Sequence, residues 1–229
     1  MRYKYLFLDL DNTIFDFSAS SKVAFSDLMV QIGVQEEADM YELYRRINAD
    51  VWKELEEGKI DQVELRKKRF KLFFEATDID FDGTLANKKY LENLIERSTL
   101  LQGANKFMQL IQERLKMVAV TNGLKEVQRP RIMQTRIQHF FDYIIVSDEI
   151  GHAKPSEHFF EIAYDPISSK IDKKDILMIG DSLVSDIQGG NNFGIDTCWF
   201  NPGRVSNLST HKPKHTVHTY QQILDIIKS

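Results

Sequence analysis

The chain has 229 residues, of which 42% are hydrophobic, so it can bury a sizeable core and is not natively disordered. Its 30 basic and 34 acidic residues give a net charge of -4, which offers no overall basis for binding nucleic acid or an anionic membrane. Cys198 is the single cysteine, which excludes an intrachain disulfide and favours a reducing compartment.

The amino terminus predicts a short buried strand that ends in two carboxylates. Residues 5–8 are apolar and are followed by Asp9 and Asp11. This apolar run is too short for a signal peptide or a membrane span, so we expect a cytoplasmic protein with no membrane partner. Alternation along a strand would place both carboxylates on one side, where they repel each other unless one is protonated or a cation lies between them.

The next segment, residues 18–97, has a helical pattern with hardly a strand candidate. Apolar side chains recur at spacings of three and four from Met40 to Leu55 and predict a helix that ends at Gly58. A second helix is expected from Gln62 to Ala76. The basic run RKKRFK at 66–71 lies in this helix, where we interpret it as a solvated face and expect no nucleic-acid partner.

From Gly103 onward, helices and strands alternate. The expected strands are 117–120, 143–146, 176–179 and 197–200, and the expected helices are 104–115, 125–138, one from Pro155, 183–193 and 220–228. Short apolar runs separated by helices predict a parallel sheet covered on both faces. The segment HKPKHTVH, with His211, His215 and His218, is interpreted as an exposed connector and not as a metal cluster.

The predicted fold class is therefore α/β. A Rossmann-like parallel sheet core is expected from residues 1–16 and 98–229, with an α-helical domain at 17–97 inserted after the first strand.

Polar side chains follow four of the predicted strands. In chain order they are Asp9, Asp11, Thr121, Asn122, Lys154, Asp181 and Asp186. Because the carboxyl ends of parallel strands lie at one edge of a sheet, these side chains should meet there. Four carboxylates against one lysine would repel one another strongly, and a divalent cation would relieve this. All candidate ligands are oxygens, which favours Mg²⁺ over Zn²⁺.

The segments DLDNT, VTNG, GHAKP and GDSLVSD, in this order, resemble the four motifs of the haloacid dehalogenase superfamily of phosphohydrolases. The resemblance spans nearly the whole chain, because GGNNFGIDTCWFN is similar to the elements after the fourth motif. The helical block lies where that family inserts its cap domain. Within the superfamily, TNGLKEVQRPRI and FFDYIIVSDEIGHAKP are similar to the branch of pyrimidine 5'-nucleotidases.

The resemblance implies a role for each candidate residue. Asp9 would be the nucleophile that forms an aspartyl phosphate, and Asp11 the acid and base, with neighbouring carboxylates helping to hold a proton on it. Thr121, the backbone amide of Asn122 and Lys154 would bind the phosphoryl group. The Mg²⁺ ligands would be the carboxylates of Asp9 and Asp181 and the main-chain carbonyl of Asp11. Asp186 would fix a metal-bound water or Lys154.

The expected function is a Mg²⁺-dependent phosphomonoesterase, a 5'-nucleotidase that releases phosphate from pyrimidine nucleoside monophosphates. Three alternatives are kept: a phosphatase of another small metabolite such as a sugar phosphate, a phosphosugar mutase, and a non-catalytic phosphate-binding protein. A haloacid dehalogenase is disfavoured, because it has no use for a proton donor at Asp11. The sequence indicates neither the physiological ester, nor the cap residues that select it, nor the oligomeric state.

Overall fold

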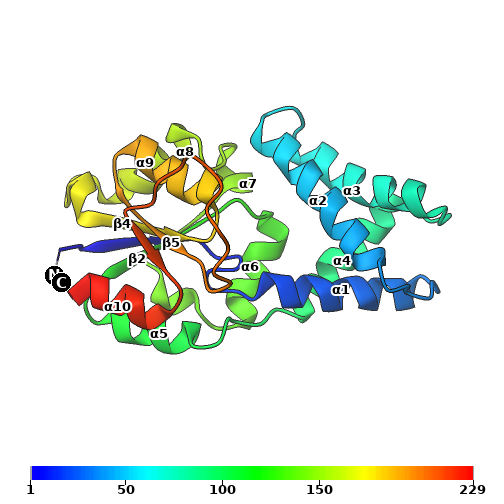
Figure 1. Ribbon diagram of the computed structural model, residues 1–229, viewed down its shortest axis with the longest axis horizontal. Helices are drawn as coiled ribbons and strands as arrows, with labels where there is room; N and C mark the ends of the chain where they lie inside the picture. Colours follow the sequence, from blue (N-terminus) through cyan, green and yellow to red (C-terminus); the bar gives the residue numbers. More distant parts are fainter. Residues whose placement is uncertain (1, 229) are drawn as a thin grey trace. The chain divides into compact units, whose positions relative to one another are not determined.

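A computed structural model of the chain describes residues 2–228 and divides it into two compact units (Figure 1). One unit, the α/β core, comprises the residues up to Asp16 and those from Thr99 onward, and the other, the helical unit, comprises Phe17–Ser98. The helical unit ends at Ser98, where residue 97 was expected.

Within the described residues, six strands form one sheet in the order β3-β2-β1-β4-β5-β6, and all neighbouring pairs are parallel. The strands are β1 Tyr5–Leu8, β2 Lys116–Thr121, β3 Tyr143–Val146, β4 Ile176–Gly180, β5 Asp196–Phe200 and β6 His215–Val217. Leu8 pairs with Ala119 on one side and with Ile179 on the other. The ends of β1, β2 and β4 therefore lie next to one another at the carboxyl edge.

The sheet is covered by helices on both faces, which explains why its central strands are apolar throughout. Leu6 and Leu8 belong to a core cluster that includes Phe107 of α5 (Ala104–Gln112) and Ile223 of α10 (Tyr220–Lys228). Tyr5 and Phe7, which point to the opposite face, belong to a second cluster that includes residues of α8 (Glu157–Tyr164) and α9 (Gly189–Phe193). Figure 1 shows α5 and α10 below the sheet and α8 and α9 above it. The fold is the predicted Rossmann-like α/β core with an inserted helical domain.

The helices of the core are short. They are α5 Ala104–Gln112, α6 Lys125–Gln134, α7 Ser147–Ile150, α8 Glu157–Tyr164, α9 Gly189–Phe193 and α10 Tyr220–Lys228. Single helical turns lie at η1 Gln138–Phe140, η2 Asp165–Ile167 and η3 Lys173–Asp175, and a wider turn forms η4 Leu183–Gln188. In η4 the amide of Ile187 donates to the carbonyl of Ser182 at 3.2 Å, five residues back. No helix among residues 2–228 is both long and apolar enough to cross a membrane.

The helical unit consists of α1 Phe17–Gln31, α2 Met40–Glu56, α3 Gln62–Thr77 and α4 Gly83–Glu96. Asp61 and Asp82 cap α3 and α4, since their side chains accept hydrogen bonds from the amides of Glu64 and Leu85. Its core is rich in aromatic rings, with Tyr44 stacked on Phe70 at 4.8 Å between ring centroids.

Three expectations are wrong at specific residues. Arg69, within RKKRFK, is not solvated but buried, where it donates to the side-chain oxygens of Asn87 and Asn48. His215 lies in β6 and not in a connector, because residues 215–217 pair with β5. Helix α8 begins at Glu157, so Pro155 precedes it instead of occupying its first turn.

Candidate active site

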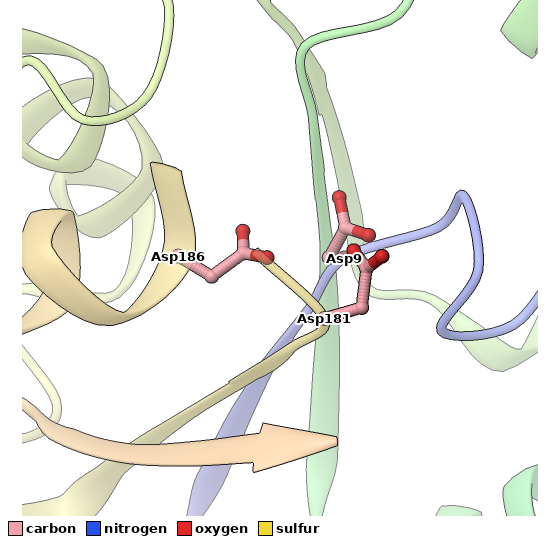
Figure 2. Close-up of side chains that lie close together, drawn as sticks. All are labelled: Asp9, Asp181 and Asp186. Carbon is pink, nitrogen blue, oxygen red and sulfur yellow. The ribbon is translucent and has the colours of Figure 1, made fainter. Parts of the chain in front are cut away.

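Three carboxylates meet at the carboxyl edge of the sheet (Figure 2). Asp9 directly follows β1, and its amide donates to the carbonyl of Ile179 in β4 at 3.0 Å. Asp181 follows β4, and its own carbonyl accepts a hydrogen bond from the indole of Trp199 at 2.7 Å. Asp186 lies in η4. Asp9, Asp181 and Asp186 each offer a carboxylate oxygen, and these oxygens lie within 4.8 Å of one another.

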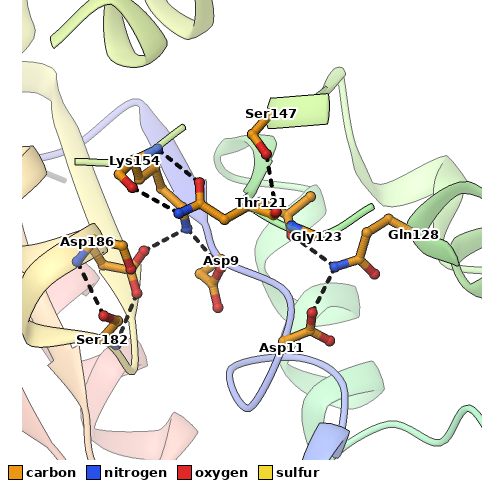
Figure 3. A network of polar contacts seen from close by, with 11 residues as sticks. Asp9, Asp11, Thr121, Gly123, Gln128, Ser147, Lys154, Ser182 and Asp186 are labelled. Atoms are coloured by element: carbon orange, nitrogen blue, oxygen red, sulfur yellow. Dashed lines mark hydrogen bonds and ion pairs between the residues drawn. The ribbon is translucent and has the colours of Figure 1, made fainter. Parts of the chain in front are cut away.

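Lys154 lies among these carboxylates with a side chain that is only 1% exposed. Its Nζ donates to Asp9 Oδ1 at 2.8 Å and to Asp186 Oδ1 at 2.6 Å (Figure 3). The backbone of Lys154 is held by the side chain of Asn122, which accepts from its amide and donates to its carbonyl, both at 2.8 Å. Since the Asn122 side chain is used in this way, only its backbone amide is left for the role expected in phosphate binding.

Asp186 is fixed through both of its carboxylate oxygens. Oδ1 accepts from Lys154, and Oδ2 accepts from the amide of Ser182 at 3.0 Å. A Cβ atom on Gly180 would lie 2.1 Å from Asp186 Oδ2, so only glycine leaves room for this carboxylate. Asp186 is therefore held in a position from which it orients Lys154.

The cluster holds more negative than positive charge. Burial raises the pKa of Asp9 to about 7 against the opposing effect of Lys154. Burial, with the charges of Asp9 and Asp186, also raises the pKa of Asp181 well above its usual range. Burial alone would lower the pKa of Lys154, but the carboxylates of Asp186 and Asp9 outweigh it and raise that pKa. Three carboxylates against one ammonium leave an excess that a divalent cation would neutralise, and the oxygen donors suit a hard one.

Asp11 follows Asp9 by two residues but faces a different set of groups. The next residue, Asn12, adopts a left-handed backbone conformation with φ 57°, which asparagine tolerates better than most residues. One oxygen of Asp11 accepts from Gln128 Nε2 at 2.8 Å and the other from Arg131 Nη1 at 2.6 Å. Both donors lie on α6. The expectation that neighbouring carboxylates help to hold a proton on Asp11 leaves out the guanidinium of Arg131, which contacts Asp11 directly.

Thr121 is the last residue of β2 and is buried. Its Oγ1 accepts hydrogen bonds from Gln128 Nε2 at 2.8 Å and from the amide of Gly123 at 3.1 Å. With two hydrogen bonds accepted, the hydroxyl proton is the part of Thr121 that remains to donate to an anion.

Sequence reasoning missed Gln128 and Arg131. Both lie in TNGLKEVQRPRI, three residues apart, which places them on one face of a helix. That shared face was the available signal. The structure brings Asp9, Thr121, Asn122, Lys154, Asp181 and Asp186 together at the carboxyl edge, and turns the carboxylate of Asp11 toward α6.

Known proteins resemble this chain over nearly its whole length. Residues 3–194 match the profile of the haloacid dehalogenase-like hydrolases. The pyrimidine 5'-nucleotidase PynA of Streptococcus pneumoniae is 36% identical, over 99% of this chain and 96% of its own. The pyrimidine 5'-nucleotidase YjjG of Escherichia coli is 30% identical, over 98% of this chain and 99% of its own. The crystal structure of the hydrolase YfnB of Bacillus subtilis, bound to magnesium, superimposes with a TM-score of 0.93 at 31% identity and covers 100% of both chains.

Proposed function

Because the chain belongs to the haloacid dehalogenase-like hydrolases and is a phosphoric monoester hydrolase, we propose that it is a Mg²⁺-dependent pyrimidine 5'-nucleotidase. The observation that carries the chemistry is the buried Asp9, held by Lys154 at 2.8 Å within a cluster of three carboxylates. The substrate class rests on the two nucleotidases that are 36% and 30% identical to this chain.

Asp9 is the proposed nucleophile. Lys154 occupies its Oδ1, so Oδ2 is the oxygen that attacks phosphorus and forms the aspartyl phosphate. The ammonium of Lys154 lies against this carboxylate and offsets charge that builds up on the transferring group. Asp186 holds Lys154 in this place from the other side.

Asp11 is the proposed acid and base. In the first half-reaction it donates a proton to the ester oxygen that leaves phosphorus. In the second half-reaction it accepts a proton from the water that hydrolyses the aspartyl phosphate. One carboxyl group thus serves both half-reactions and is returned to its starting state.

The phosphoryl oxygens are proposed to be bound by Thr121, by the backbone amide of Asn122 and by Lys154. The carboxylates of Asp9 and Asp181 and the main-chain carbonyl of Asp11 would hold Mg²⁺, which neutralises charge on the phosphate when it is bound. The oxygen-only donors and the excess negative charge of the cluster support this choice of ion.

The activity test is a screen of phosphate esters at equal concentration. We expect phosphate release from UMP, dTMP and CMP with Mg²⁺, and loss of that release with EDTA or in the Asp9→Asn variant. An Asp9→Asn variant with undiminished turnover would refute the nucleophile. Turnover of sugar phosphates with none of the pyrimidine nucleotides would refute the substrate class and leave the phosphatase intact. Net isomerisation of a sugar phosphate would identify a mutase, and phosphate binding without any turnover would identify a non-catalytic protein.

A further inference from the structure

The carboxylate of Asp11 is held by two side chains of α6. Gln128 Nε2 donates to Oδ2 at 2.8 Å, and Arg131 Nη1 donates to Oδ1 at 2.6 Å. A carboxylate that accepts a separate donor at each oxygen has its plane fixed as well as its position. Gln128 lies 117 positions after Asp11 in the sequence, and Arg131 lies 120 positions after it. Both contacts therefore depend on how α6 packs against the turn after β1.

The two donors are themselves immobilised. The Arg131 side chain is 1% exposed, and its guanidinium lies over the ring of Phe15 with 4.2 Å from Cζ to the ring centroid. Arg131 Nη1 also donates to Gln128 Oε1 at 3.0 Å, so the arginine fixes the glutamine amide as well. Burying a guanidinium costs free energy unless it forms well-oriented hydrogen bonds to an opposite charge. For Arg131 that partner is the carboxylate of Asp11.

Gln128 connects Asp11 to the phosphate-binding threonine. The same Nε2 that donates to Asp11 also donates to Thr121 Oγ1 at 2.8 Å (Figure 3). Gly123 makes this possible, because a Cβ atom there would lie 2.3 Å from Gln128 Nε2. One amide group thus sets the distance between the proposed acid and the proposed phosphate ligand.

We propose that Gln128 and Arg131 are positioning residues for the proton transfer by Asp11. In the first half-reaction the bond between Asp9 and phosphorus forms and the bond from phosphorus to the ester oxygen breaks. The proton of Asp11 passes to that ester oxygen and leaves a carboxylate, which Gln128 and Arg131 hold through both oxygens. This inference rests on the role proposed for Asp11, and the two positioning residues act through Asp11 without forming a bond to phosphorus or transferring the proton themselves.

The test compares two aryl phosphates that differ in how much their leaving oxygen needs a proton. Phenyl phosphate releases a weakly acidic phenol and depends on the acid, whereas 2,4-dinitrophenyl phosphate releases a strongly acidic phenol and does not. The measured quantity is kcat/KM, which reports on steps up to the first irreversible one, here the transfer to Asp9. Asp11→Asn is the reference for complete loss of the acid, and its effect should be confined to phenyl phosphate.

We expect Gln128→Met and Arg131→Met to lower kcat/KM for phenyl phosphate by about 10- to 100-fold and for the dinitrophenyl ester by less than about threefold. Arg131→Lys should recover part of the loss, since it restores a cation near Asp11. The matched control is Arg129→Met, also on α6, where Arg129 pairs with the exposed Glu149 at 2.7 Å. This variant should leave kcat/KM unchanged for both substrates.

An equal loss on both substrates, or no loss on either, would overturn the positioning role and leave a purely structural one. Thermal unfolding checks each variant, and if Arg131→Met does not fold, the uncharged and similarly sized Gln128→Met decides the question. If Asp11→Asn alone discriminates between the substrates, only the positioning role is overturned. If Asp11→Asn lowers kcat/KM equally for both substrates, the acid role of Asp11 is wrong, and so is the positioning role that depends on it.

Discussion

The charge excess at the carboxyl edge predicts how stability depends on pH when metal is removed. The substitution Asp9→Asn replaces the buried carboxylate by a neutral group of the same shape. Burial raises the pKa of Asp9 from 3.8 to about 7, so between these values the folded chain binds a proton that the unfolded chain has lost. Stability then falls as pH rises. The contribution of Asp9 is fully present below pH 3.8 and is lost by about pH 7.

The magnitude follows from the size of this pKa change. A pKa of Asp9 that is higher by about three in the folded chain corresponds to about 4 kcal/mol in the free energy of unfolding. This figure is an upper limit, because Asp181 competes for the same proton and its pKa is raised too. Asn cannot ionise, so the variant should match the wild type near pH 4 and exceed its stability by up to about 4 kcal/mol near pH 8.

The assay is urea unfolding of both proteins in EDTA at several values of pH from 4 to 8. The difference in free energy of unfolding between variant and wild type cancels the contributions of other carboxylates that both proteins share. One of these is Asp175, whose pKa is lowered by the hydrogen bond from Lys4 and which therefore has the opposite pH dependence. Adding Mg²⁺ at 100 times its Kd should reduce the advantage of the variant at pH 8 by about 2.7 kcal/mol, because the ion stabilises only the folded wild type. A difference in EDTA that is flat or falls with pH would contradict a raised pKa of Asp9 in the folded chain.

Three further predictions follow from single contacts. Gly180→Ala should lower kcat by about tenfold or more, because the added Cβ would displace Asp186. Gly203→Ala is the control and should leave kcat unchanged, because its Cβ would lie 3.7 Å from Cγ2 of Val205. Equal kcat values for the two variants would contradict this. Asn122→Ala removes the side chain that holds the Lys154 backbone and should lower kcat by about tenfold, measured with UMP; an unchanged kcat would show that Lys154 is held without it. Asp82→Ala removes the cap of α4 and should lower the free energy of unfolding by about 1 kcal/mol without changing kcat, so a loss of activity at unchanged stability would argue against a purely local role.

Much of the α/β core was predictable because its signals are local. A run such as residues 176–179 is apolar, short and flanked by helices, and a parallel sheet then dictates where its end lies. Asp9, Asp181 and Thr121 were located together for this reason alone. Strand β6 was missed because it has three residues, of which Val217 alone is fully buried, so an edge strand of this length carries little pattern.

What escaped prediction depends on long-range packing. Arg131 and Arg69 are both arginines in helices with basic or polar neighbours, and such residues are mostly exposed. Their burial follows from which face the helix turns inward and from partners far away in sequence, Asp11 for one and Asn87 for the other. A single sequence shows that Gln128 and Arg131 share a face, but only the packed chain shows what that face meets.

The two carboxylates after β1 have different partners although they lie only two residues apart. Asp9 remains in the line of β1 and shares its charge with Lys154, Asp181 and Asp186, where burial raises its pKa. The carboxylate of Asp11, two residues further on, accepts hydrogen bonds from Gln128 and Arg131 instead. Pairs of titratable groups in unlike surroundings can take unlike roles. The spacing of two residues therefore does not place both carboxylates in one cluster, as strand alternation alone would suggest. Each has its own cation, Lys154 at Asp9 and Arg131 at Asp11.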